Sequence, residues 1–238
     1  METSNPLLQR DIDYSATEAS GSMELQGTIN KSGLLLLMCM ATAFYAWTHP
    51  ALHGPLMIIG LLGGLVACLV GTFVPTTAPL AAPAYALLEG LALGAISQIF
   101  DSRFPGIVAN AMLLTFCVLG LMLFLYSTRI VRVTPRFMLG VFMATGAVGL
   151  VYLIDFVMRL FHHPLPYLND ASPIGVGISL VIVAIAAANL LMDFAVIEQN
   201  VQQRAPKYME WYCGMALLVT LVWLYLEILR LLSKLQKR

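Results

Sequence analysis

The chain has 238 residues and no formal net charge; 59% of its residues are hydrophobic and only 11% are charged. Its mean hydropathy is +0.83, whereas soluble domains are about 25% charged and about 45–50% apolar, so the composition excludes a soluble enzyme. The lack of net charge argues against nucleic acid or an acidic partner as the main ligand. We therefore expect an all-α protein that satisfies its own backbone hydrogen bonds inside a lipid bilayer.

Residues 1–32 differ from the rest of the chain because they are polar, mixed in charge and without clear periodicity. They contain the small-residue stretch from Ala16 to Gly21, and no basic leader followed by a short apolar core, so no signal peptide is expected. This composition is typical of a flexible tail. We predict a polar N-terminal tail over residues 1–32 and a single transmembrane domain over residues 33–238.

Seven apolar segments are long enough to cross a bilayer, which takes about 20 helical residues. Prolines mark most of the joins between them. The predicted spans, in chain order, are Gly33–Trp47, Pro55–Val74, Pro79–Phe100, Gly106–Ser127, Phe137–Phe161, Ile174–Ile197 and Tyr208–Leu232. The first is the shortest, and it could extend upstream through Asn30 and Lys31.

Basic residues between the spans favour a cytoplasmic N-terminus. The N-terminal face would carry Arg10, Lys31, Arg129, Arg132, Arg136, Arg204 and Lys207, and the opposite face Arg103, Lys234, Lys237 and Arg238. The C-terminal lysines point the other way, and an even number of spans would remove that conflict.

Four polar residues form a predicted inner tier within the membrane. Glu89 is about ten residues into the third span, near mid-membrane, and Asp193 is about a turn inside the N-terminal face. Asn189 precedes Asp193 by one helical turn, and Thr220 lies near the middle of the seventh span. The small residues Gly90 and Gly94 are expected to bring another helix close to Glu89.

Glu89 and Asp193 have no basic residue one helical turn away, so each needs another explanation at membrane depth. One interpretation is that each is protonated or hydrogen-bonded and serves only in helix packing. The other is a coupled pair of acids that shares a proton or a cation. Such a pair would suit pH-dependent gating and could offer oxygen ligands to calcium.

A second tier of charges is predicted toward the opposite face. Asp155 and Arg159 are spaced i, i+4 late in the fifth span, and Glu227 and Arg230 are spaced i, i+3 late in the seventh. An acid and a base on one helix face neutralise each other locally. The alternative is that this tier forms an outer vestibule or gate.

Cysteine and histidine give no indication of a metal site. The cysteines lie singly within apolar runs, and the histidines lie in predicted loops on the non-N-terminal face, where solvated side chains are more common than a proton sensor or metal cluster. These residues are Cys39, Cys68, Cys117 and Cys213, and His49, His53, His162 and His163.

Several short motifs together resemble the Bax inhibitor-1 family of seven-helix membrane proteins, in particular its bacterial branch. They span most of the chain, and together they are fairly specific. The motifs are Gly27-Thr28-Ile29-Asn30-Lys31, Glu89-Gly90 with Leu93-Gly94, Leu191-Met192-Asp193-Phe194 through Ile197-Glu198, Ala205-Pro206, Met209-Glu210-Trp211-Tyr212, and Leu224 to Leu232.

The resemblance implies six helices around a central seventh, and a pH-sensitive calcium leak controlled by one acid in the sixth helix and one in the seventh. Asp193 matches the sixth-helix acid, but Thr220 stands at the expected seventh-helix position. Glu227 is the only acid deep in that helix, and it would lie roughly 20 Å in depth from Asp193. Because of its depth in the membrane, we expect Glu89 to be the partner acid of Asp193. The alternative is that the calcium function is altered in this chain.

Two functions follow as hypotheses. The first is a calcium or cation leak in a bacterial inner membrane, with no enzyme activity and no cofactor. The second is a non-conducting regulator that binds a membrane protease through its polar tail. A retinal photoreceptor would need a lysine midway along the last span, and none precedes Lys234 there; an intramembrane hydrolase would need a nucleophile and base at membrane depth.

Overall fold

The computed structural model describes residues 21–161 and 170–237, and its long elements are all helices. Seven of them within this part of the chain are long and apolar enough to span a membrane. They are α2 (Leu25–Thr48), α3 (His53–Phe73), α4 (Ala78–Arg103), α5 (Ile107–Ser127), α6 (Pro135–Leu160), α8 (Pro173–Gln202) and α9 (Met209–Gln236). The predicted all-α membrane bundle is confirmed.

Local sequence explains where α6 and α8 begin. Pro135 and Pro173 occupy first-turn positions of α6 and α8, where a missing N–H costs nothing. The preceding residues cap the helices: the Phe137 N–H donates to Thr134 Oγ1 and the Gly175 N–H donates to Ser172 Oγ, each at 3.2 Å. The boundaries therefore fall within a few residues of those predicted.

The first helix is the main departure, because α2 begins at Leu25 rather than at Gly33. Residues 25–32, which were predicted to belong to the tail, are therefore helical, while residues 1–20 of that predicted tail lie outside the described residues. Thr28 is buried, and Lys31 pairs with Glu210 of α9, so two polar residues of this first part of α2 are held inside the protein. Hydropathy alone could not show that, since the partner lies 179 residues away.

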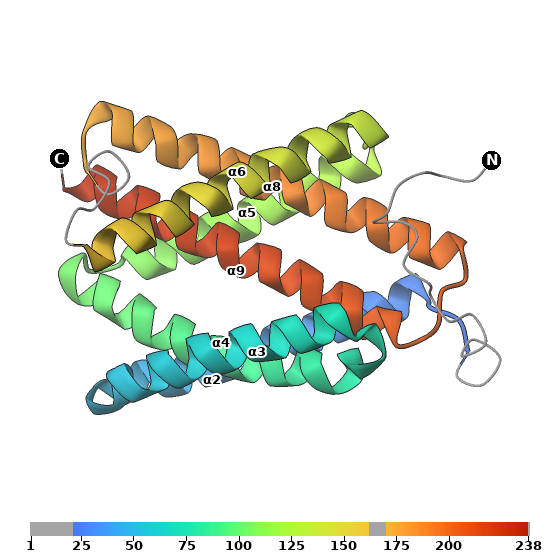
Figure 1. The fold of residues 1–238 in the computed structure, drawn as a ribbon, viewed down its shortest axis with the longest axis horizontal. Coiled ribbons are helices and arrows are strands. Elements are labelled where there is room, and N and C mark those ends of the chain that lie inside the picture. The colour runs from blue at the N-terminus through green and yellow to red at the C-terminus, as the bar shows by residue number, and fades with distance from the viewer. Residues whose placement is uncertain (1–20, 162–169, 238) are drawn as a thin grey trace.

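Helix α9 runs through the middle of the bundle, with α6 and α8 on one side of it and α2, α3 and α4 on the other (Figure 1). Many of its residues are buried along its whole length, from Met209 to Lys234. The expectation of a central last helix is therefore confirmed.

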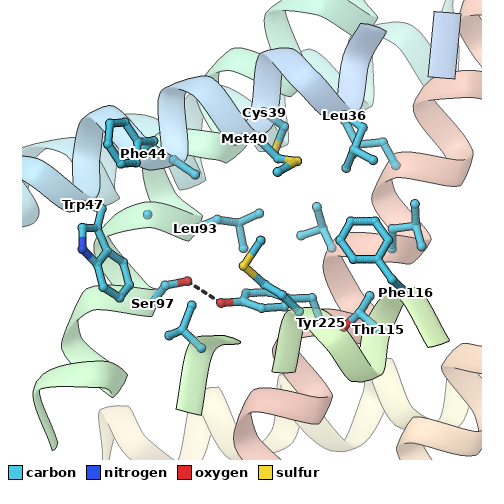
Figure 2. A pocket seen from close by; sticks show the side chains of 17 residues that line it. Leu36, Cys39, Met40, Phe44, Trp47, Leu93, Ser97, Thr115, Phe116 and Tyr225 are labelled. Carbon is cyan, nitrogen blue, oxygen red and sulfur yellow. Dashed lines mark hydrogen bonds between the residues drawn. The ribbon is translucent and has the colours of Figure 1, made fainter. Parts of the chain in front are cut away.

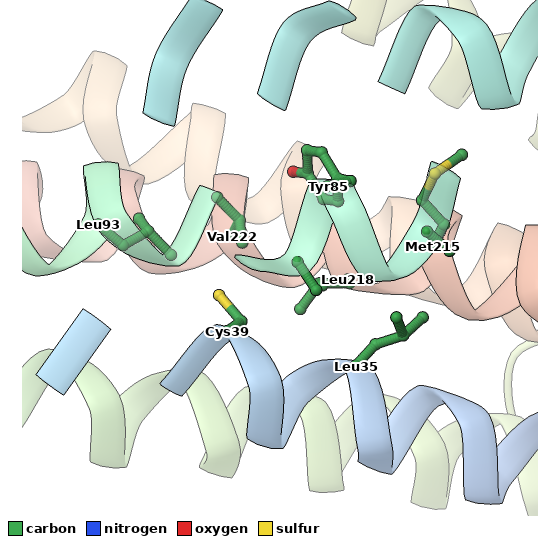
Figure 3. Packing of buried hydrophobic residues seen from close by; sticks show 9 residues of the cluster. Leu35, Cys39, Tyr85, Leu93, Met215, Leu218 and Val222 are labelled. Atoms are coloured by element: carbon green, nitrogen blue, oxygen red, sulfur yellow. The ribbon is translucent and has the colours of Figure 1, made fainter. Parts of the chain in front are cut away.

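One core cluster joins α2 and α4 to this central helix (Figure 3). Leu35 of α2 and Tyr85 of α4 pack with Leu218 of α9, and all three are at most 5% exposed. Helix α4 approaches α2 closely at Gly94, where a Cβ would overlap the Ala43 carbonyl oxygen. The predicted close helix contact beside Glu89 is thus present.

The outer helices show apolar side chains to their surroundings. Leu62 of α3, Leu113 of α5 and Leu139 of α6 are 60–65% exposed. In water such a surface would be strongly unfavourable, whereas in a bilayer it faces hydrocarbon. The chain is an integral, multi-pass membrane protein.

Candidate functional site

Asp193 carries a buried carboxylate oxygen that the described residues leave without a hydrogen-bond partner. It lies on α8 where this helix packs against α9, and the oxygen concerned is its Oδ2 atom. Thr220 and Cys213 of α9 lie beside its carboxyl group. A buried polar atom without a partner is uncommon in native proteins, and it often marks a functional group or a bound ion.

Glu89 lies in a different environment, on the side of α4 that faces α2 and α3. Its Oε2 atom comes so close to Gly64 of α3 that a Cβ there would be 2.7 Å away. Cys39, Cys68 and Tyr85 are near enough to interact electrostatically with it. Glu89 forms no hydrogen bond or ion pair with any residue that the structure describes.

The structure does not bring Glu89 and Asp193 together. Helices α4 and α8 lie on opposite sides of α9 (Figure 1). The predicted partnership rested on equal depth in the membrane, but depth does not fix which neighbour a helix face meets. The close contact at Gly94 docks α4 onto α2, and this leaves Glu89 pointing toward α3.

Asn189 also faces away from the central helix. Its Nδ2 donates to Thr145 Oγ1 of α6 at 2.8 Å and to the Ile185 carbonyl oxygen at 2.9 Å. The predicted inner tier of four residues is therefore divided into three places. Asp193 and Thr220 meet at the α8–α9 contact, Asn189 joins α8 to α6, and Glu89 lies apart.

Both predicted outer pairs are formed. Arg159 Nε lies 2.7 Å from Asp155 Oδ2, and Arg230 lies 3.1 Å from Glu227 Oε1. Glu227 also accepts hydrogen bonds from Tyr152 of α6 at 2.7 Å and from Trp223 at 3.2 Å. This second pair therefore ties α6 to the central helix as well as neutralising charge.

An ion pair that the sequence did not reveal closes the N-terminal end of the bundle. Glu210 of α9 is 1% exposed, pairs with Lys31 of α2, and accepts the Glu24 backbone N–H at 3.0 Å. Lys31 also lies over the Trp211 ring, 5.2 Å from its centroid. Gly27 and Lys31 are spaced i, i+4, so they share the face of α2 that meets Glu210. The sequence could indicate this shared face only if the helix was known to begin at Leu25.

Lys234, which the sequence assigns to the basic C-terminal end on the non-N-terminal face, is a buried cation near the other end of α9. It is 2% exposed and donates to the Gly175 carbonyl oxygen at 2.9 Å and to Ser179 Oγ at 2.7 Å, both on α8. Thr220, Glu227 and Lys234 recur at seven-residue spacing, which sets them along one side of the helix.

A family model described as Bax inhibitor 1 like matches residues 5–237, nearly the whole chain. The chain belongs to the Bax inhibitor 1 like family. No curated protein and no solved structure gives a significant match to it. The family resemblance inferred from the sequence motifs is therefore confirmed over nearly the whole chain.

In this Bax inhibitor 1 like chain, the polar groups of the central helix follow one another from end to end. Glu210 with Lys31 lies at the N-terminal end, Thr220 with Asp193 lies further in, and Glu227 with Arg230 lies toward the other end. The carboxylate and hydroxyl oxygens at Asp193 and Thr220 are the ligand types that hard cations prefer. The Lys31–Glu210 and Glu227–Arg230 ion pairs lie on either side of these two residues along α9.

Three of the cysteines lie beside the membrane acids: Cys213 is near Asp193, and Cys39 and Cys68 are near Glu89. All four cysteines are free thiols, and the described residues hold no group of three His, Cys, Asp or Glu side chains that could bind a metal ion. His49 and His53 lie near carbonyl oxygens at the end of α2, at 2.8 Å from Tyr45 and 3.1 Å from Ala46. His162 and His163 lie outside the described residues.

Proposed function

We propose that this chain is a pH-sensitive leak for calcium or a similar cation, with Asp193 as its ion-binding and gating acid. The observation that supports this most directly is the buried Oδ2 atom of Asp193, which has no partner among the described residues. A buried carboxylate is costly unless its charge is compensated. A proton or a passing cation would supply that compensation.

In this proposal the ionised Asp193, with the Thr220 hydroxyl beside it, holds a cation briefly. A proton on the same carboxyl removes the charge that attracts the cation. Passage also requires two closures between helices to separate, Glu210 with Lys31 of α2 and Glu227 with Tyr152 of α6, which a shift of α9 against α2 and α6 would achieve. The proposal includes no catalytic step and no cofactor, and it places the N-terminus in the cytoplasm of a bacterium.

The test is calcium flux into dye-loaded proteoliposomes across a pH series, with wild type, Asp193→Asn and Glu89→Gln. Because an asparagine side chain cannot ionise, the flux of the Asp193→Asn variant should be independent of pH and equal to the low-pH value of the wild type. Glu89→Gln is the matched control: it also neutralises an acid in a membrane helix, on the far side of α9 from α8. It should leave the pH dependence in place.

A wild-type flux that changes with pH in the same way after Asp193→Asn would contradict the assignment. A wild type that shows no flux at any pH would remove the leak altogether. The second hypothesis, a regulator that binds a membrane protease or similar partner, would then take its place.

One observation favours that second function as a candidate. The N-terminal segment is held against the α8–α9 loop: the Met23 N–H donates to the Ala205 oxygen at 2.7 Å, and the Lys207 N–H donates to the Gly21 oxygen at 3.1 Å. Gly21, where the described residues begin, therefore lies beside the exposed Arg204 and Lys207. Capture of a membrane protease by the full chain, lost on deleting residues 1–20, would support this role.

A further inference from the structure

A cavity of about 400 Å³ lies between the outer helices and the central one, away from Asp193 (Figure 2). Its walls come from α2, α4, α5 and α9. Met40 and Phe44 of α2 and Phe116 of α5 line it and are also 39–70% exposed on the outer surface. The cavity therefore opens sideways, between α2 and α5.

The inner wall is formed by the central helix. Leu218, Leu221 and Val222 of α9 line the cavity and are 2–8% exposed. Leu93 of α4 completes this wall, and Figure 2 shows its side chain directed into the space. A molecule that touches these residues must have entered between the outer helices.

The side chains that line the cavity favour a hydrocarbon ligand. No charged side chain is present among the described residues that line the cavity. Its hydroxyl groups already have partners: Ser97 and Tyr225 share a hydrogen bond of 2.6 Å, and Thr115 donates to its own helix at Ala111, at 2.8 Å. Water needs two to four polar partners, and the described lining offers it no hydroxyl group that is still without one.

The position of the opening indicates what lies outside it. On α2 the lining runs from Leu36 to Trp47, which is roughly 16 Å at the rise of an α-helix. That is about half of the ~30 Å hydrocarbon thickness, with Trp47 at the end where an interfacial tryptophan is expected. The medium in contact with the opening is therefore the acyl region of one leaflet.

We propose that this cavity binds one acyl chain of a bilayer phospholipid, which enters between α2 and α5 from the leaflet on the Trp47 side. Its volume falls within the roughly 300–1,000 Å³ typical of ligand sites. An empty apolar space of this size would forfeit the dispersion contacts of its walls, and a lipid chain restores them. Because Leu218 and Leu221 flank Thr220 in sequence, the chain would press on the turn of α9 that faces Asp193 on its other side.

The experiment reconstitutes the full chain in nanodiscs of phosphatidylcholine that carries a photoreactive diazirine on one acyl chain. After illumination, the labelled residues are mapped by mass spectrometry. The result expected is labelling of Leu218, Leu221 or Val222, which are buried in the absence of an inserted chain. Labelling confined to exposed positions on the outer helices would overturn the proposal.

A pair of neighbouring substitutions gives a matched control. Met112→Trp fills the cavity from α5, whereas Leu113→Trp places the same side chain on the adjacent residue, which is 65% exposed and outside the lining. Met112→Trp should lower the labelling of α9 by about tenfold because the indole takes the space of the acyl chain. Leu113→Trp should leave it unchanged.

If Met112→Trp does not yield folded protein, Val108→Phe fills the same cavity with a smaller change. Native mass spectrometry supplies a second measurement: one retained phospholipid is expected on the wild type, and it should be absent from the filled variant. Unchanged α9 labelling in a folded filled variant, or retention of a small apolar molecule in place of phospholipid, would overturn the proposal.

Discussion

At the scale of single residues, buried charge in this protein occurs in two forms. Glu210 and Glu227 are each 1% exposed and are compensated by Lys31 and Arg230. Asp193 has no basic partner in the described part of the chain, and its buried Oδ2 atom accepts no hydrogen bond there. Compensated charges hold helices together, while an uncompensated acid such as Asp193 is where a proton or cation has most effect.

The Lys31–Glu210 pair should contribute strongly to stability. Lys31→Met leaves a buried carboxylate without its counter-ion, which should cost about 3 kcal/mol of unfolding free energy. Lys207→Met changes an exposed lysine nearby and should cost far less. Unfolding of the detergent-solubilised protein by increasing denaturing detergent measures both.

A double-variant cycle checks the reason for that loss. Lys31→Met combined with Glu210→Gln should be more stable than Lys31→Met alone, because the second change removes the orphaned charge. If the two losses simply add, the pair does not interact in the way its geometry implies.

At the scale of the helices, small residues decide which faces meet. Helix α4 packs on α2 at Gly94 and on α3 at Gly60, where a Cβ would be 2.6 Å from the Leu88 oxygen. Such contacts fix the rotation of α4 about its axis, and through it the direction of Glu89. Helices α5 and α6 present mostly apolar, exposed surface and leave their outer faces to the lipid.

Adding one methyl group should therefore disrupt α4 packing. Gly94→Ala places a Cβ against the Ala43 carbonyl oxygen, and we expect a loss of about 2–3 kcal/mol. Gly120→Ala on α5 makes the same change where nothing lies within 4 Å, and it should be neutral or slightly stabilising. Thermal unfolding in detergent compares the two; equal midpoints would show that the α2–α4 contact is not as close as described.

At the scale of the whole molecule, one helix carries the polar groups from end to end. Helix α9 meets Lys31 of α2, Asp193 of α8 and Tyr152 of α6 in turn. Movement of α9 would therefore act on both closures and on the central acid together. In the proposed leak, this coupling would allow a proton at one residue to alter passage through the bundle.

The separation of the two acids has a consequence for the pH profile. Interacting acids titrate in coupled steps, whereas an isolated acid titrates as a single site. With Glu89 on the far side of α9, calcium flux should follow a one-proton curve in pH. Fitting the proteoliposome flux at closely spaced pH values measures the slope, and a cooperative two-proton curve would indicate that a second acid joins Asp193.

The sequence by itself determined the membrane class, the seven spans, the family and the local charge pairs. These follow from hydropathy, helix breakers and spacings of three or four residues, all of which act within one segment; Asp155–Arg159 and Glu227–Arg230 are examples. Only the tertiary structure decided that Glu89 and Asp193 are apart, that Glu210 meets Lys31 and that Lys234 is buried against α8. Those outcomes depend on the rotation of each helix about its axis, which is set by packing between segments far apart in the chain.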